Sequence, residues 1–324
     1  MLKYVLKRIL SALVTIFFII TITFFLMKAI PGNPFAAEKM PNPEIEAAMM
    51  ASTAWNTKGV PEEVTQAMEA KYGLDQPLWK QYIIYLGNFL RGDFGVSYTK
   101  AGLTVNKVIA DGFPFSLTIG IYASLVVVFA GILFGSVCAL RQNKLIDRFF
   151  MVLSTLGSTI PSFVLATGFL FLFSKTLGLV PAFGVDEVAG YIGPVLVIGA
   201  FPLSFITRLT RTSLVEVQQQ DYIRTARSKG ISEFKVIYKH ALRNALLPVV
   251  TYIGPMVASI VTGSFVIETV FGIPGVGQLF TDSIVNRDYP LIMGITVFFA
   301  VLLVLAVLIV DLVYVLIDPR IKLD

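Results

Sequence analysis

The side chains that most often carry catalysis or bind metals are scarce in this sequence. It contains one histidine, His240, and one cysteine, Cys138, which stand in separate segments. A metal site usually draws on several histidine, cysteine or carboxylate ligands, and nucleophilic catalysis needs a nucleophile beside a base. A single cysteine also excludes an intrachain disulfide. The sequence therefore predicts no catalytic residue, no metal site and no bound cofactor.

A sequence motif for nucleotide binding is missing as well. The sequence has no glycine-rich loop of the form G-x-x-x-x-G-K-[ST], whose backbone amides and lysine hold nucleotide phosphates. We therefore expect that the chain does not hydrolyse ATP by itself and is not an enzyme.

The composition is that of a membrane protein. Of the 324 residues, 56% are hydrophobic and 15% are charged, against about 45–50% and about 25% in a typical soluble domain. Six stretches lack Asp, Glu, Lys and Arg, and each is close to the ~20 residues that a membrane-crossing helix needs. They are Ile9–Met27, Phe115–Leu140, Phe149–Phe173, Val188–Ile206, Ala245–Ile267 and Leu291–Val310. The pattern predicts an all-α membrane protein with six transmembrane helices, and it excludes a soluble enzyme, a disordered tail and a nucleic-acid-binding module.

The charges between these stretches indicate an orientation. The side that holds the N-terminus, residues 141–148, residues 207–244 and the C-terminal end carries a net charge of +10, and the opposite side carries −4. Basic residues near helix ends stay in the cytoplasm. Both termini are therefore expected to be cytoplasmic. The first stretch ends at Met27–Pro31 without a small-x-small cleavage site, so we interpret it as a retained helix and not as a signal peptide.

The same pattern predicts the organisation of the chain. We divide it into residues 1–30 with the first helix, an extracytoplasmic insertion at 31–114, and a core membrane domain at 115–324 that carries the cytoplasmic loop 207–244. An impermeant thiol reagent should then reach cysteines placed in the insertion, for example at Ser52 and Thr99.

The insertion itself is expected to fold. Pro61 followed by two glutamates is typical of a helix start, and Gly73 of a helix end. A second helix is expected to follow, because six apolar residues recur near helical spacing and would share one face. They are Trp79, Tyr82, Ile83, Leu86, Phe89 and Leu90. The insertion is either a cap on the outer helix ends or a docking surface for an external partner, and the sequence leaves both open.

The predicted membrane helices are irregular and carry few charges. Prolines fall inside the third, fourth and fifth stretches, and Gly131 and Gly135 form a small-xxx-small pair in the second. Such residues are ordinary kinks and packing notches, or they mark a mobile pathway. Lys28 can snorkel from a helix end to the interface. No chain of buried acids and bases crosses the bilayer, which argues against a proton-driven secondary transporter.

The connection between the fourth and fifth helices has the strongest pattern. Asp221 opens a short amphipathic helix that Gly230 breaks. Ser232 and Glu233 are then suited to cap a second one, whose apolar positions Phe234, Val236, Ile237, Ala241 and Leu242 follow one face. This is either a solvated connecting loop or a handle for a soluble partner.

The segment resembles the ATPase-docking loop, the EAA loop, of membrane subunits in bacterial ABC importers. Residues 221–230 read D-Y-I-R-T-A-R-S-K-G, residues 240–244 read H-A-L-R-N, and Pro248 follows. This form is similar to the oligopeptide/dipeptide/nickel branch, although the broader family has Glu-Ala-Ala where this chain has Arg224-Thr225-Ala226.

Other motifs extend the resemblance over nearly the whole chain. They are Pro31–Pro34, Tyr72–Pro77, Gly92–Ser97, Glu268–Gly277 and Arg287–Pro290. The long insertion after the first helix resembles that of the first, B-type, permease subunit. The run at 51–60 departs from the family as extra length.

The resemblance implies a type I ABC importer permease fold and a set of partners. These are a second homologous permease subunit, two cytoplasmic ATPases that bind ATP and Mg²⁺, an extracytoplasmic substrate-binding protein, membrane lipid and a peptide substrate. It places the chain in the bacterial cytoplasmic membrane as a multi-pass protein.

The resemblance also implies two groups of functional residues. The ATPase-docking residues are Asp221, Arg224, Ala226, Arg227, Lys229, Gly230, Glu233, His240, Arg243 and Asn244. The candidates for an external gate or loop are Glu268, Phe271, Gly272, Pro274, Gly275 and Gly277. Within the first group we expect Ala226 to lie in a groove of the ATPase and the charged residues to set the register at the rim.

The cargo is the least determined part of the prediction. Oligopeptides are favoured over metal, because the predicted helices contain no histidine and one cysteine. Dipeptides, a nickel chelate, glutathione or a sugar oligomer remain alternatives within the same class of importer.

Overall fold

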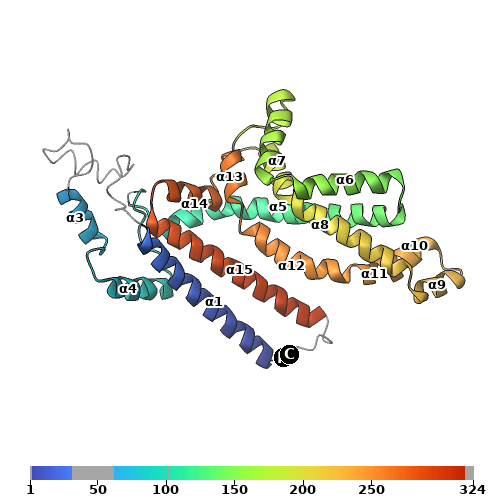
Figure 1. Cartoon of the computed structure of the whole chain (residues 1–324), viewed down its shortest axis with the longest axis horizontal. Coiled ribbons are helices and arrows are strands. Elements are labelled where there is room, and N and C mark those ends of the chain that lie inside the picture. Colours follow the sequence, from blue (N-terminus) through green and yellow to red (C-terminus); the bar gives the residue numbers. More distant parts are fainter. Residues whose placement is uncertain (1, 31–61, 101, 318–324) are drawn as a thin grey trace. The chain divides into compact units, whose positions relative to one another are not determined.

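A computed structural model describes residues 2–30, 62–100 and 102–317 of the chain. Within these ranges the chain is helical, apart from one isolated antiparallel bridge between Val96 and Thr104 (Figure 1). The helices are α1 (Leu2–Ala29), α3 (Glu62–Lys71), α4 (Leu78–Leu90), α5 (Val105–Leu140), α6 (Leu145–Thr159), α7 (Ser162–Phe169), η1 (Leu170–Thr176), η2 (Val188–Tyr191), α8 (Ile192–Gln218), α9 (Asp221–Ser228), α10 (Glu233–Lys235), η3 (Val236–Ala241), α11 (Leu242–Ala245), α12 (Leu247–Val261), α13 (Phe265–Phe271), α14 (Val276–Val285) and α15 (Tyr289–Ile317).

The chain forms two compact units. The first combines Met1–Pro114 with Gln278–Leu305, and the second combines Phe115–Gly277 with Ala306–Asp324. The expected division at residues 30 and 114 stays a prediction, as do the sites at 31–34, 51–60 and Ser52, which lie outside the described residues.

The expectation of an all-helical membrane protein is confirmed. Four helical segments of the described chain are long and apolar enough to cross a membrane: Leu6–Ala29, Val105–Leu140, Val188–Gln218 and Tyr289–Val310. Two bent helix pairs raise the number of candidate spans to six if each pair crosses once.

The third predicted helix is broken. Residues 149–173 were expected to form one helix with Pro161 inside it, but α6 ends at Thr159 and α7 begins at Ser162, with a bend of 110° between α6 and the α7–η1 segment. Ile160 is extended, with φ −76° and ψ 127°. A residue before proline avoids helical angles, and Pro161 has no N–H with which to continue the helix. The proline therefore ends α6.

The fifth predicted helix is interrupted twice. It was expected over 245–267, but α12 ends at Val261 and α13 starts at Phe265. Gly263 has φ +88°, which side chains rarely adopt, and it leads the chain out of the helix. At the other end, α12 meets the preceding helical segment at a bend of 52°, where Pro248 occupies its first turn.

Two helices extend beyond their uncharged stretches. α5 begins ten residues before Phe115, in a turn where Lys107 and Asp111 form an exposed ion pair of 2.6 Å. α8 continues twelve residues beyond Ile206. The first twelve residues of the expected cytoplasmic loop 207–244 are therefore a direct continuation of α8, a candidate membrane helix.

The first unit packs α4 against α1 through aromatic side chains. Tyr82 lies 5.4 Å from Phe24 between ring centroids, and its hydroxyl is 2.8 Å from that of Thr21. Tyr85 stacks on Phe24 at 5.5 Å. The start of α3 at Glu62 and the turn at Gly73, with φ +67°, agree with the prediction from the sequence. The apolar face predicted for α4 is only partly covered, because Trp79, Ile83 and Leu90 are exposed.

The second unit has one main hydrophobic core between α5, α7, α8, α12 and α13. Gly131 and Gly135 of α5 face α8 across this core. A Cβ on Gly131 would lie 2.7 Å from the Ile206 side chain, and one on Gly135 would lie 2.5 Å from the carbonyl of Thr207. The small-xxx-small pair therefore permits a close approach of two helices, as its spacing predicts.

Candidate functional site

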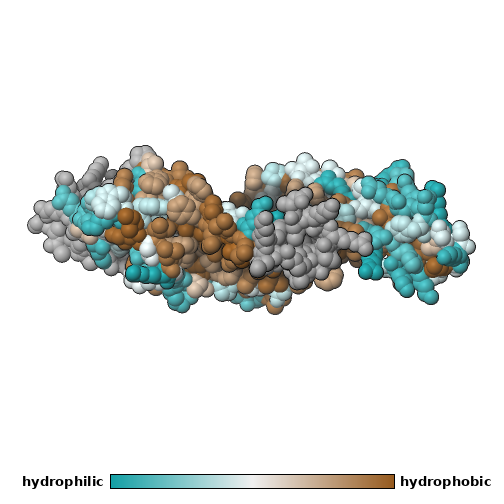
Figure 2. Space-filling model, turned by 90° about the horizontal axis from the view of Figure 1, so that it is seen from below, coloured by the Kyte–Doolittle hydropathy of each residue, from teal (hydrophilic) through white to brown (hydrophobic). Residues whose placement is uncertain are grey.

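The predicted docking segment forms one end of the second unit. α8 leads directly into α9, and α10, η3 and α11 return to α12 (Figure 1). Figure 2 shows hydrophilic residues gathered at the end of the second unit that α9 and α10 form. The segment is thus a folded helical hairpin at the tip of a long helix, and we call residues 219–245 the tip hairpin.

A small hydrophobic cluster holds the tip hairpin together. Its buried members come from α5, α8, α9, η3 and α11, and they are Ala139, Leu214, Ile223, Ala226, Val236, Ala241 and Ala245. Because buried apolar side chains on each helix meet in one cluster, the hairpin is fixed to the adjoining ends of α5 and α8.

Gly230 makes the reversal between α9 and α10. Its φ is +71°, and nothing lies within 4 Å of the position of a Cβ. The amide of Gly230 donates to the carbonyl of Arg227 at 3.0 Å, and that of Ile231 donates to Ala226. The requirement for glycine is therefore one of backbone conformation and not of space.

A bidentate ion pair braces the same turn. The guanidinium of Arg227 donates to both carboxylate oxygens of Glu233, from Nε at 3.1 Å and from Nη2 at 2.7 Å. These hydrogen bonds raise the pKa of Arg227 above its ordinary value. Both side chains are exposed, so the pair sets the geometry of the turn and contributes little to stability.

Two expectations for the hairpin need correction. Ala226 was expected to face a groove of a partner, but it is 7% exposed and belongs to the internal cluster, since its small side chain lets α9 pack on its own neighbours. Phe234 was assigned to the apolar face of the second helix, but it is 69% exposed and packs on exposed Tyr238 at 4.4 Å between ring centroids. We call Phe234 and Tyr238 the exposed aromatic pair.

The remaining predicted docking residues lie around these features. Asp221 and Arg224 form an exposed pair of 3.8 Å, and Asn244 donates to the Tyr222 hydroxyl at 2.8 Å, which ties α11 to α9. Four more members of the set also belong to the hairpin: Lys229 and Arg243 are exposed, His240 is half-buried, and Glu233 is in the ion pair.

A buried ion pair next to the hairpin escaped sequence reasoning. Asp147, at the start of α6, accepts from Arg211 Nε at 2.7 Å and from Nη2 at 2.8 Å, and it also accepts from the Asn143 amide. The carboxylate is 3% exposed. A separation of 64 residues left no signal for the pairing. It joins α6 to the part of α8 that leads into the hairpin.

The predicted outer segment is built around a buried carboxylate. Glu268, 1% exposed, accepts from the Gly277 amide at 2.7 Å and from the Ser264 amide at 3.3 Å. A Cβ on Gly275 would come within 2.6 Å of the Ser116 hydroxyl and closer still to the carboxylate. The sequence predicts Glu268 at the outer end of a helix. In the structure, the backbone of residues 263–277 folds around its carboxylate.

The other predicted members of this segment follow from that fold. Gly272 ends α13 with φ +62°, and Phe271 is buried against the core. Pro274 is exposed, and the Val276 amide donates to the hydroxyl of Ser116 at 2.9 Å. The structure therefore brings the whole set together, as a compact turn and not as a free loop.

The first unit also contains a buried carboxylate, Asp288. Asp288 accepts from the hydroxyls of Ser97 and Thr99 and from the amides of Tyr98 and Thr99. Burial and the Asp288 charge raise the pKa of Tyr98. The labelling site expected at Thr99 is therefore a poor one, since this residue is buried and hydrogen-bonded.

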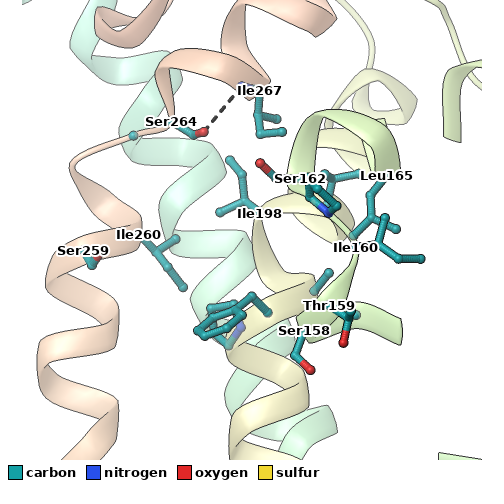
Figure 3. A pocket seen from close by; sticks show the side chains of 17 residues that line it. Ser158, Thr159, Ile160, Ser162, Leu165, Ile198, Ser259, Ile260, Ser264 and Ile267 are labelled. Carbon is teal, nitrogen blue, oxygen red and sulfur yellow. Dashed lines mark hydrogen bonds between the residues drawn. The ribbon is translucent and has the colours of Figure 1, made fainter. Parts of the chain in front are cut away.

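A pocket of about 470 Å³ lies where the broken helices of the second unit meet (Figure 3). α6, α7, α8, α12 and the turn before α13 line it. The lining includes five hydroxyl side chains, Ser158, Thr159, Ser162, Ser259 and Ser264, and no charged residue. No group of three potential metal ligands occurs among the described residues.

The sequence matches one family along almost its whole length. Residues 131–323 match the binding-protein-dependent transport system inner membrane component, and residues 1–120 match the N-terminal part of such membrane components.

Similar proteins carry related descriptions. The dipeptide transport system permease protein DppB of Bacillus subtilis is 46% identical over 100% of this chain and 99% of its own length. The oligopeptide transport system permease proteins OppB of Haemophilus influenzae and Salmonella typhimurium are 43% and 40% identical, each over 99% of this chain and 100% of their own. A solved chain of the MetNI methionine ABC transporter, in an inward-facing conformation, is similar in fold, with a TM-score of 0.55 and 16% identity over 65% of this chain and 96% of its own.

Proposed function

The chain belongs to the family of binding-protein-dependent transport system inner membrane components, and we propose that it forms half of the path by which an ATP-driven importer moves peptides across the bacterial cytoplasmic membrane. As a member of this family it is a multi-pass permease subunit of an ABC importer and not itself catalytic. The observation that carries the proposal is the tip hairpin, a folded and mainly polar surface that is fixed to the inner ends of membrane helices.

The tip hairpin is where ATP hydrolysis acts on this chain. Its partners are two cytoplasmic ATPases, which bind ATP and Mg²⁺. The basic residues around it, such as Arg224 and Lys229, are exposed and steer an acidic surface. Since the hairpin shares its cluster with α5 and α8, closure of the ATPases biases these helices between two conformations.

The complete permease has two homologous membrane subunits, each of the type I importer fold. In this chain six spans result when each of the two bent helix pairs crosses once, with both termini in the cytoplasm. The insertion at 31–114 then faces the outside, where it meets the substrate-binding protein. The excess of basic residues on the side of the tip hairpin supports this orientation.

Peptides are the cargo, and oligopeptides are our first choice among them. Relatives named for oligopeptide transport and relatives named for dipeptide transport support the two lengths equally. Peptide length is therefore a variable of the experiment.

Co-expression tests the proposal. The chain is expressed with its second permease, two ATPases and binding protein, and is affinity-purified from the membrane fraction. Both ATPases should co-purify, and uptake of labelled peptides of two to six residues should need every component. ATP hydrolysis or peptide uptake by the purified chain alone would contradict the proposal.

A further inference from the structure

The pocket of Figure 3 lies beside two helix breaks of the second unit and a proline inside a third helix. α6 ends and α7 begins beside it, α12 ends one turn before α13, and Pro202 lies inside the continuous helix α8. Its volume is in the range of pockets that hold small ligands, about 300–1,000 Å³. Irregular backbone at membrane depth is tolerated where it is buried in protein or lines an aqueous cavity.

Two prolines leave backbone carbonyls at the pocket without the N–H donor that a regular helix provides. In a regular helix the carbonyls of Gly157 and Ile198 would accept from the residues four positions later, which are Pro161 and Pro202. Neither proline has an N–H. All four residues line the pocket.

The hydroxyl groups add to this set. Ser158 donates its hydrogen to the carbonyl of Thr155 at 3.1 Å, which leaves its oxygen as an acceptor for another group. The Ser162 side chain is directed into the space beside Ile198 and Ile267 (Figure 3). Thr159 lines the same wall and is exposed.

The pocket lacks the groups that would select a charged ligand. Its lining contains no Asp, Glu, Lys, Arg or His, and the carboxylate nearest in the chain, Glu268, is already engaged by two backbone amides. A ligand that complements this lining offers neutral N–H donors, which the free carbonyls and hydroxyl oxygens can accept, next to apolar atoms. The main chain of a peptide offers both.

We propose that this pocket is a binding station for the main-chain amides of a peptide in transit, and that Thr159 and Ser162 accept hydrogen bonds from them. The inference rests on the proposed function. It predicts that the permease recognises a feature common to all peptides and disregards their side-chain charges and termini. Such a pocket binds any one peptide weakly and selects little among peptides. Weak binding suits transport, because the bound peptide must leave again.

A two-by-two comparison tests it. Uptake of a peptide is compared with uptake of the same peptide N-methylated at one central amide, by the intact complex and by the complex with Thr159→Val. The quantity compared is the uptake rate of the unmodified peptide divided by that of the N-methylated peptide. The preference of the binding protein cancels, because the same binding protein serves both complexes. In Thr159→Val this ratio should fall roughly two- to tenfold, the effect of one neutral hydrogen bond. Thr155→Val, one turn earlier on α6 and exposed, should leave the ratio unchanged.

The possible outcomes separate the two proposals. Equal ratios in the wild-type and Thr159→Val complexes, while the wild type imports peptide, would overturn the pocket assignment and leave the transport function standing. If Thr159→Val does not accumulate in the membrane, Ser162→Ala replaces it, and an unchanged ratio there also overturns the assignment. A wild-type complex that imports no peptide would overturn the proposed function itself.

Discussion

Glu268 shows how one side chain can organise a segment of backbone. Its carboxylate receives the amides of Ser264 and Gly277, and Gly275 leaves the space that it occupies. The sequence identified these residues together only as a motif. The reason they belong together is that a buried carboxylate needs donors on several sides and glycines around it.

Removing this carboxylate should therefore destabilise the protein without touching its cytoplasmic surface. Glu268→Ala leaves the buried amide of Gly277 and the part-buried amide of Ser264 without this acceptor and should lower the free energy of unfolding by about 2–3 kcal/mol. Glu216→Ala, which removes an exposed carboxylate from α8, is the control. Thermal unfolding in detergent measures both. Equal stabilities of the two variants would show that Glu268 has no such role.

Gly230 acts through its backbone angle. Since the space around it is open, Gly230→Val changes only the cost of a positive φ, about 1–2 kcal/mol. Asparagine tolerates this conformation, so Gly230→Asn should keep most of the ATP hydrolysis that the binding protein stimulates, whereas Gly230→Val should lose it several-fold. Equal losses in both variants would indicate that the glycine is needed for contact with a partner and not for the turn.

At the scale of elements, Phe234 of the exposed aromatic pair is the residue that sequence reasoning assigned to the wrong side. Helical spacing placed Phe234 on a buried face, yet α10 is only three residues long and passes into η3, a wider helix with a different spacing. Spacing predicts a face only while the helix is regular. In η3, a π-helix, residues five apart lie on one face, so Val236 and Ala241 are buried together.

This correction gives a sharper prediction for the tip hairpin. Phe234→Ala with Tyr238→Ala removes two exposed rings, so the fold should be unchanged. Binding of the ATPases should weaken at least tenfold, since aromatic side chains are often the energetic centres of interfaces. Phe183→Ala removes a ring that is 70% exposed in the loop after η1 and is the control. Unchanged ATPase binding by the double variant would contradict the assignment.

The sequence predicted where the helices lie better than it predicted where they are interrupted. Uncharged stretches located the membrane segments, and Gly230 and Gly73 were placed correctly as turns. Prolines were recognised, but nothing in the sequence distinguishes Pro202, which stays inside α8, from Pro161, which ends α6. That difference depends on what packs around each residue. The pairing of Asp147 with Arg211 depends on tertiary contacts in the same way.

For the whole molecule, the orientation in the membrane follows from charge and can be tested by labelling. Lys80 on α4 is exposed in the described structure, and so is Lys229 at the tip hairpin. In a Cys138→Ala background, an impermeant thiol reagent should label Lys80→Cys on intact cells. It should label Lys229→Cys only after permeabilisation. The reverse pattern would invert the topology and remove the basis for a cytoplasmic docking site.

The central claim is that the tip hairpin contacts the ATPases, and photo-crosslinking tests it most directly. A benzophenone amino acid replaces Phe234 in the assembled, transport-active complex, and the same group replaces Phe183 in a parallel preparation. We expect a covalent product between this chain and an ATPase from position 234 and none from position 183. An active complex that gives no ATPase product at position 234 would contradict it.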